Sequence, residues 1–179
     1  METDIIASEL AASSARLDPA GMDSLRSKIQ SAQRIFVYGT GRSGLMLKAL
    51  AMRLMQIGYT SYVVGETTTP SIEGEDLLIT ASASGETASV CSTAASALKQ
   101  GAVLATVTAD PASTLAGIQA PDLVISSPTK FAESAASVQP LGSLFEQMLL
   151  VVFDGLVLQL TAAGDASNAD MAHRHASLE

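Results

Sequence analysis

Two short glycine-rich turns carry the hydroxyl and backbone N–H groups that could hold an anion. The first is GTGRSG at 39–44 and the second is SASGET at 82–87. Each turn precedes a helical pattern, and the free N–H groups at the start of a helix attract anions. With an arginine available as a charged donor, the two turns together favour one phosphate site. The residues predicted to hold the phosphate are Gly41, Arg42, Ser43, Ser82, Ser84, Gly85 and Thr87.

Each turn taken alone also has a simpler explanation. Ser84 and Thr87 could merely cap the helix that follows them, as serine and threonine do routinely. The first turn also fits the G-x-G-x-x-G dinucleotide pattern, and Glu66 follows at about the spacing expected of a ribose-binding acid. The chain has no room for a separate substrate domain, however, and two converging turns suit one phosphate better than a dinucleotide.

The elements that must position these turns form an alternating pattern. Asp18-Pro19 is typical of a helix start, so helices are expected over 1–33, before an α/β core over 34–160 and a helical tail over 165–179. Strands are expected at 34–38, 61–64, 77–81, 102–108 and 122–125, and helices at 43–57, 86–100 and 140–160, with a short helix after Asp110-Pro111. This alternation predicts one three-layer αβα domain with a five-stranded parallel sheet. Ligands should then bind at the carboxyl ends of the strands.

Bulk composition excludes several classes of function. The net charge of -8 argues against nucleic acid, because binding to a phosphate backbone requires a basic face. No leader segment is evident, and the apolar stretch from Met148 to Leu160 is too short to span a bilayer, so a cytoplasmic protein is expected. Two histidines far from the single Cys91 form no N/S ligand cluster, which predicts a reaction without a metal.

Several segments resemble the sugar isomerase (SIS) domain family, and within it the 6-phospho-3-hexuloisomerases. The two turns are typical of the broad family, whereas GETTTPSI at 65–72, QPLGSLFE at 139–146 and RHASLE at 174–179 are similar to the hexuloisomerase branch. The family more often has SGSGET and RHANLE at the second turn and the tail. Ala83 and Ser177 therefore depart from the pattern, but the hydroxyls and the acidic and histidine side chains of those motifs remain.

The resemblance implies a function and an assembly. A protein of this branch interconverts D-arabino-3-hexulose 6-phosphate and D-fructose 6-phosphate through a cis-enediol, as the second step of formaldehyde fixation by the ribulose monophosphate route. It does so without a cofactor, and as a homotetramer with active sites at the subunit interfaces. The expected partners are therefore a small sugar phosphate and further copies of the same chain, with no nucleic acid and no membrane.

Moving a carbonyl between adjacent carbons requires a base, and a partly buried carboxylate can serve. Glu146, near the start of an apolar helix, is favoured narrowly; Glu66, at the end of a strand, comes second, and Glu179 is a further candidate. Glu146 could equally be placed there by the helix dipole alone. The family motif selects His175 as a proton carrier, which could act only if the tail folds back, for instance onto a neighbouring subunit.

Two other functions stay open at this point. The same phosphate site could sense a sugar phosphate in a regulatory module that performs no reaction, although sensors of this family usually carry a DNA-binding domain, and none is visible here. A nucleotide-binding oxidoreductase fragment would explain the first turn together with Glu66.

Overall fold

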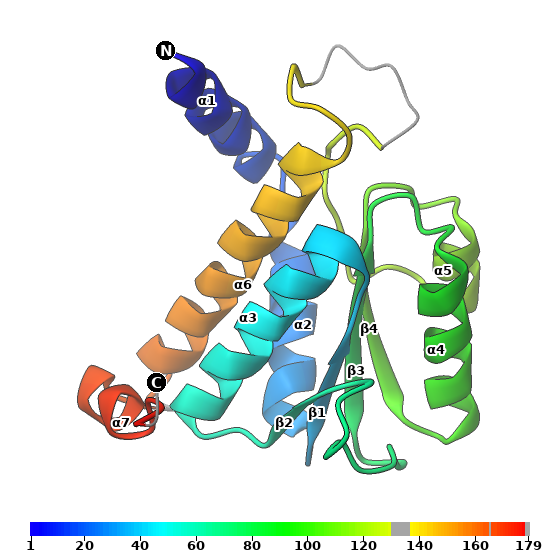
Figure 1. Cartoon of the computed structure of the whole chain (residues 1–179), viewed down its shortest axis with the longest axis vertical. Helices are drawn as coiled ribbons and strands as arrows, with labels where there is room; N and C mark the ends of the chain where they lie inside the picture. Colours follow the sequence, from blue (N-terminus) through cyan, green and yellow to red (C-terminus); the bar gives the residue numbers. More distant parts are fainter. Residues whose placement is uncertain (130–136, 165, 178–179) are drawn as a thin grey trace.

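Seven helices and five strands make up the described part of the chain, which comprises residues 1–129, 137–164 and 166–177 of this computed structural model (Figure 1). In chain order they are α1 (Glu2–Ser14), α2 (Pro19–Ser31), β1 (Ile35–Tyr38), α3 (Gly41–Ile57), β2 (Ser61–Val63), β3 (Leu77–Ser82), α4 (Ala88–Lys99), β4 (Val103–Thr108), α5 (Thr114–Ile118), β5 (Leu123–Val124), α6 (Ser143–Ala162) and α7 (Asn168–His173).

The five strands form one parallel sheet in the order β2-β1-β3-β4-β5. β1 pairs with β3 from Ile35 opposite Leu77 to Tyr38 opposite Thr80, so these two strands end close together. Every residue of β3 is buried, as expected for a central strand with helices on both faces. The predicted five-stranded parallel α/β architecture is therefore confirmed.

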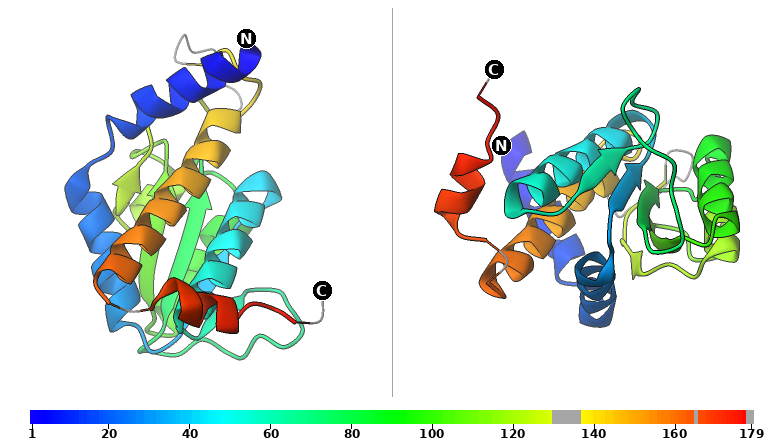
Figure 2. Two further views of the ribbon diagram at one scale, coloured as in Figure 1. Left: turned by 90° about the vertical axis from the view of Figure 1, so that its left-hand side faces the viewer. Right: turned by 90° about the horizontal axis from the view of Figure 1, so that it is seen from below.

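Helices cover both faces of the sheet, as Figure 2 shows from two sides. α2, α3 and α6 lie on one face, where Leu47, Leu54 and Phe153 belong to the larger hydrophobic core. α4 and α5 lie on the other face over a smaller core that includes Phe36 and Leu78. The aliphatic and alanine-rich composition suits this arrangement, because small side chains let helices pack closely on the sheet.

The apolar stretch expected to be too short to span a bilayer belongs to a longer helix, α6, which has the length and hydropathy of a membrane-spanning helix but packs in the core of the domain. Its most apolar window is 56% buried inside the protein, between α1, α2 and α3. Among the described residues it is the one helix that meets this criterion of length and composition. Its apolar character therefore has an explanation in packing alone.

α1 extends beyond the sheet and is tied to the segment that leads into α6 (Figure 1). The carboxylate of Glu9 on α1 accepts hydrogen bonds from Ser137 Oγ at 2.7 Å, Val138 N at 2.8 Å and Gln139 Nε2 at 2.8 Å. The bonds from Gln139, Ser137 and Val138 lower the pKa of Glu9. α1 therefore acts as an anchor for the start of α6.

Most element boundaries agree with the sequence prediction to within two or three residues, but the short helix does not begin at Asp110. The carboxylate of Asp110 accepts a hydrogen bond from Ala112 N and closes a turn, and α5 begins only at Thr114, where the hydroxyl of Ser113 serves as the cap. Asp-Pro and a nearby serine are both good helix starts in sequence, so local sequence favours the wrong one.

The first glycine-rich turn brings two backbones into direct contact. A Cβ atom on Gly44 would lie 2.5 Å from the carbonyl oxygen of Gly39 and 2.8 Å from its carbonyl carbon. This contact fixes how closely the start of α3 packs against the end of β1. Glycine at position 44 is therefore a requirement of packing, because no larger side chain has space there.

We predict that Gly44→Ala lowers the free energy of unfolding by about 1–3 kcal/mol, because the obstructing atoms belong to the backbone and cannot rotate away. Chemical denaturation followed by circular dichroism would measure the change. Gly117→Ala is the matched control, since a Cβ there meets nothing within 4 Å. A stable Gly44→Ala variant, equal to that control, would contradict the packing argument.

Candidate active site

A cavity of about 290 Å³ opens at the carboxyl edge of the sheet, between the ends of β1 and β3. β1 continues into α3 on one face and β3 continues into α4 on the other, so the two connections separate and leave a crevice. The residues lining it are Thr40, Ser43, Ala81, Ser82, Ala83, Ser84, Glu86, Thr87, Gly142 and Glu146. The two predicted turns therefore face one cavity.

The first turn presents the start of α3 to this cavity. Thr40 occupies the N-cap position, but its side chain makes no capping hydrogen bond. Gly41 follows with a φ of 56°, a left-handed conformation that favours glycine. Ser43, in the first turn of the helix, lines the cavity.

The second turn presents the start of α4 with its hydroxyls linked to one another. Ser82 Oγ and Thr87 Oγ1 are 3.1 Å apart, and Ser82 Oγ also accepts from Gly85 N at 3.2 Å. Ser84 Oγ accepts from Glu86 N at 3.2 Å. Thr87 stands at the N-cap of α4 but makes no side-chain capping bond, so capping does not explain its hydroxyl.

Four described helices begin without a side-chain capping bond from the N-cap residue; one is α1, whose N-cap is Met1, and the other three begin beside the cavity. α2, α5 and α7 have side-chain caps, supplied by Asp18, Ser113 and Ser167. α3, α4 and α6 all begin beside the cavity, and their N-cap residues Thr40, Thr87 and Gly142 provide no such bond. Three helix starts therefore direct their free N–H groups and positive dipole ends toward one space, which suits an anion.

The polarity of this cavity comes from hydroxyls and backbone groups. Among the described residues that line it, none is lysine or arginine. Arg42 is predicted from the sequence as a phosphate donor, yet its Nη1 lies 3.2 Å from Glu146 Oε2 and 3.2 Å from Ser143 Oγ, and it does not line this cavity. The arginine instead contacts the acid that the cavity contains.

Glu146 is the predicted base that lies in the cavity. It belongs to the first turn of α6, its side chain is only 10% exposed, and Arg42 holds one of its carboxylate oxygens. The hydroxyl of Ser143 donates to Pro140 O at 2.8 Å, and this bond links the start of α6 to the turn before it. A buried carboxylate therefore lines the same cavity as the two glycine-rich turns.

The turn that leads into α6 is strained. Leu141 has a φ of 57°, which a residue with a bulky side chain rarely adopts, and the residue is 68% exposed. Gln147 Nε2 donates to Gln139 Oε1 at 2.8 Å, and this bond joins the turn to α6 and, through Glu9, to α1. Surrounding contacts thus hold a conformation that places Gly142 at the cavity.

Other predicted residues lie elsewhere. Glu66 is exposed and paired with Lys48 at 3.1 Å, outside the cavity lining. Gly85, with a φ of 63°, packs against Ser113 and not against the cavity, and Gly41 lies at its rim, outside the lining set. Glu179 falls outside the described residues.

His175 lies at the opposite end of α3 from the cavity. Its neighbour Arg174 donates to Gln56 O in the last turn of α3 at 3.1 Å, and the tail runs along that end of the molecule (Figure 1). α3 contains 17 residues, so at the helical rise its two ends are about 25 Å apart. The His175 of this chain therefore does not reach the cavity of the same chain.

Thr40, Gly142 and Glu86 are cavity residues that the sequence prediction missed as site residues. Thr40 and Glu86 belong to the two turns but have no distinguishing pattern of their own. Gly142 follows Leu141 in the QPLGSLFE segment, and a glycine directly before an apolar helix was the available signal.

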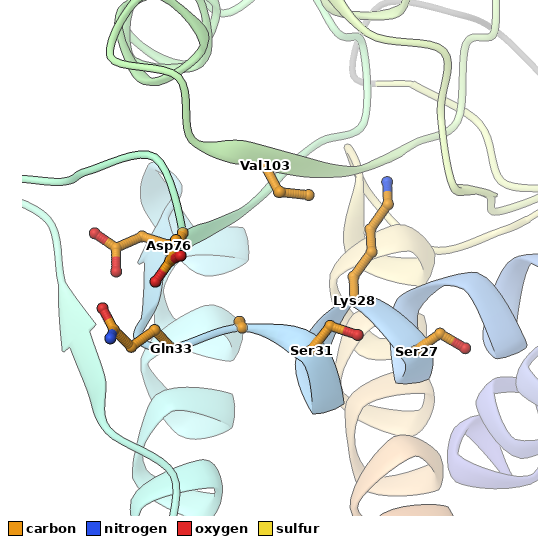
Figure 3. A pocket seen from close by; sticks show the side chains of 8 residues that line it. Ser27, Lys28, Ser31, Gln33, Asp76 and Val103 are labelled. Atoms are coloured by element: carbon orange, nitrogen blue, oxygen red, sulfur yellow. The ribbon is translucent and has the colours of Figure 1, made fainter.

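A larger cavity of about 560 Å³ lies at the amino edge of the sheet, and Figure 3 shows its side chains. Two of its charged groups, Lys28 and Asp76, already have partners within the protein. Lys28 pairs with Asp122 at 2.6 Å and donates to Leu104 O, and Asp76 receives two hydrogen bonds from Arg34. This cavity lies at the opposite edge of the sheet from the two glycine-rich turns, so it is separate from the candidate site.

In residues 1–129, 137–164 and 166–177, no group of three or more His, Cys, Asp or Glu side chains could hold a metal ion. Cys91 is buried behind the second turn, where its thiol donates to Gly85 O at 3.3 Å. Burial raises the pKa of this thiol, so it remains protonated and serves the packing of the turn.

Comparisons with known proteins agree with this geometry. The SIS domain family matches residues 28–153. The chain is 41% identical to a 3-hexulose-6-phosphate isomerase of Bacillus subtilis (97% of this chain and 95% of that protein) and 41% identical to one of Mycobacterium gastri (98% and 88%). A crystal structure from Methanococcus jannaschii, reported to infer a function of 3-hexulose-6-phosphate isomerase, is 32% identical, has a TM-score of 0.83 and covers 99% of both chains. The chain therefore belongs to the SIS domain family.

Proposed function

We propose that this chain is an isomerase that interconverts D-arabino-3-hexulose 6-phosphate and D-fructose 6-phosphate. The observation that carries the proposal is the convergence of three helix starts without side-chain caps on one cavity that also contains a buried carboxylate. Near full-length relatives named 3-hexulose-6-phosphate isomerase support the choice of substrate.

The phosphate of the substrate would bind at the two turns. Ser43, Ser82, Ser84 and Thr87 would donate their hydroxyls, and the starts of α3 and α4 would supply N–H groups. The backbone N–H groups that now donate to the hydroxyls of Ser82 and Ser84 would then donate to phosphate oxygens, which are stronger acceptors. This site would fix one end of the sugar.

Glu146 would act as the base at the other end. The reaction moves a carbonyl from C3 to C2: a base removes the C2 proton, a cis-enediol forms, and the proton returns to C3. Arg42 would keep the carboxylate oriented toward the sugar, and the low exposure of Glu146 would limit competition from water. The reaction is a proton transfer without net oxidation, so it needs no redox cofactor.

We also propose that the protein acts in the cytoplasm as a homotetramer. Large apolar side chains on the outer faces of α3 and α6 are exposed, as expected of a surface that a second copy covers: Leu45, Met52, Met55, Leu150, Val151 and Leu158. His175, too far from the cavity of its own chain, would enter the site of a neighbouring subunit and carry a proton between the substrate oxygens.

Hydrogen exchange in heavy water tests the reaction with one available compound. We predict that the protein, incubated with D-fructose 6-phosphate in D₂O, replaces the C3 proton with deuterium, because the 2,3-enediol forms and is reprotonated at C3. Proton NMR would follow the loss of that signal. Exchange at C1 would instead indicate an aldose-ketose isomerase, and an absence of exchange despite binding would indicate a sensor without turnover.

Glu146→Gln should lower the rate of this exchange by about a hundred- to ten-thousand-fold while KM stays nearly unchanged, because only the base is lost. Glu66→Gln is the matched control and should keep the rate within about fivefold, since it removes one exposed ion pair. If Glu66→Gln abolished exchange and Glu146→Gln did not, the two roles would be reversed.

Mixed oligomers test whether His175 acts between subunits. We predict that His175→Ala and Glu146→Gln are each inactive alone, whereas their co-expression restores activity, because some sites then combine an intact acid from one chain with an intact histidine from the next. With random mixing in a symmetric oligomer about a quarter of the sites are intact. Purified mixtures with activity no higher than the parent variants would contradict the arrangement.

A further inference from the structure

Glu86 is an acidic residue on a turn that must bind an anion, and it lines the same cavity. A carboxylate beside a phosphate is repulsive, so its presence there requires a reason. Both of its oxygens are engaged on Thr114 at the start of α5: Oε1 accepts from the backbone N–H and Oε2 from the hydroxyl, each at 2.7 Å.

We infer that Glu86 is a positioning residue that holds the second turn in its phosphate-binding shape by fastening it to the start of α5. The inference rests on the proposed phosphate-binding role of that turn and adds a residue to it. Glu86 itself need not touch the substrate, because its carboxylate is directed at a neighbouring segment.

The other contacts of the turn point the same way. Gly85 O accepts from Leu115 N at 3.0 Å, and Ala83 O accepts from Ala109 N at 3.1 Å. A Cβ on Gly85 would overlap the side chain of Ser113, so the turn lies directly on this segment. Backbone carbonyls thus attach the turn to residues 109–115, and Glu86 supplies the side-chain link in the set.

The bonds from Thr114 also direct the carboxylate oxygens of Glu86 toward α5. The bonds from the Thr114 hydroxyl and then its N–H lower the pKa of Glu86, so the carboxylate stays ionised and remains an acceptor for both donors. Its oxygens are thereby held toward α5, while the hydroxyls of Ser82 and Ser84 keep their positions at the cavity.

Two substitutions at Glu86 separate this role from the alternatives. Glu86→Ala removes the link and should raise both KM for D-fructose 6-phosphate and the inhibition constant of inorganic phosphate by about three- to tenfold, with kcat unchanged. Glu86→Gln removes the charge but can keep the link, because its amide oxygen can accept from the Thr114 N–H and its NH2 can donate to the Thr114 hydroxyl; both constants should therefore stay at or below the wild-type values. If both variants tighten phosphate binding, Glu86 acts through repulsion alone; if both lose kcat with KM intact, it is catalytic. Either result overturns the inference.

Thr114→Pro tests the link from the other side without touching Glu86. Proline removes both donors yet suits the first position of a helix, and Ser113 already has the extended conformation (φ -73°, ψ 167°) that precedes proline. We expect a rise in KM at least as large as in Glu86→Ala, and the double variant should be no worse than Thr114→Pro. Additive losses would overturn the inference.

Glu75→Ala is the control for removing an exposed acid, because Glu75 lies at the opposite edge of the sheet and should leave both constants unchanged. Measurements on the wild-type protein distinguish failure of the proposed function from failure of the role assigned to Glu86. If it neither exchanges the sugar proton nor binds inorganic phosphate, the proposed function fails. If it does both and Glu86→Ala behaves like wild type, only the role of Glu86 fails.

Discussion

The parallel pairing of β1 with β3 is the constraint on which the site depends. These neighbours end at the same edge, but their chains leave toward opposite faces of the sheet, one into α3 and the other into α4. A crevice at that point follows from the topology and does not need side chains to open it. The close contact between Gly39 and Gly44 then sets the position of the first helix start relative to the strand.

The proposed phosphate site would explain how an acidic protein can select a phosphate. With a net charge of -8 the chain as a whole repels anions, and the cavity lining that the structure describes contains no cationic side chain. In the proposed site local dipoles would supply the attraction instead, because helix starts and hydroxyls act over short distances, whereas the diffuse charge of the surface is screened by salt. Arg42 lies beside the cavity but is paired with Glu146.

Local sequence was sufficient to predict most helices and strands and the two turns, because their signals are apolar periodicity, glycines and hydroxyl residues that lie within a few positions of one another. It was insufficient for partners distant in sequence. Arg42 fits a phosphate donor by its place in the turn, yet it binds Ser143, 101 positions later, and that choice depends on how α3 packs against α6. Glu66 and Glu146 were similarly hard to rank, because only the tertiary fold decides which of them faces the cavity. The prediction placed the start of α5 too early, because two residues suited to cap a helix, Asp110 and Ser113, lie three positions apart.

The anchor between α1 and the segment before α6 bears on how much of the chain is needed for function. The stretch common to the wider SIS family begins at residue 28, whereas Glu9 fastens the backbone that sets the first turn of α6, and with it the buried acid. A protein trimmed to the shared region would lose Glu9 and its bonds to the segment before α6, and it would also lose Leu25 of α2 and Leu160 of α6, which belong to the hydrophobic core. We therefore expect the functional unit to be longer than the stretch common to the family.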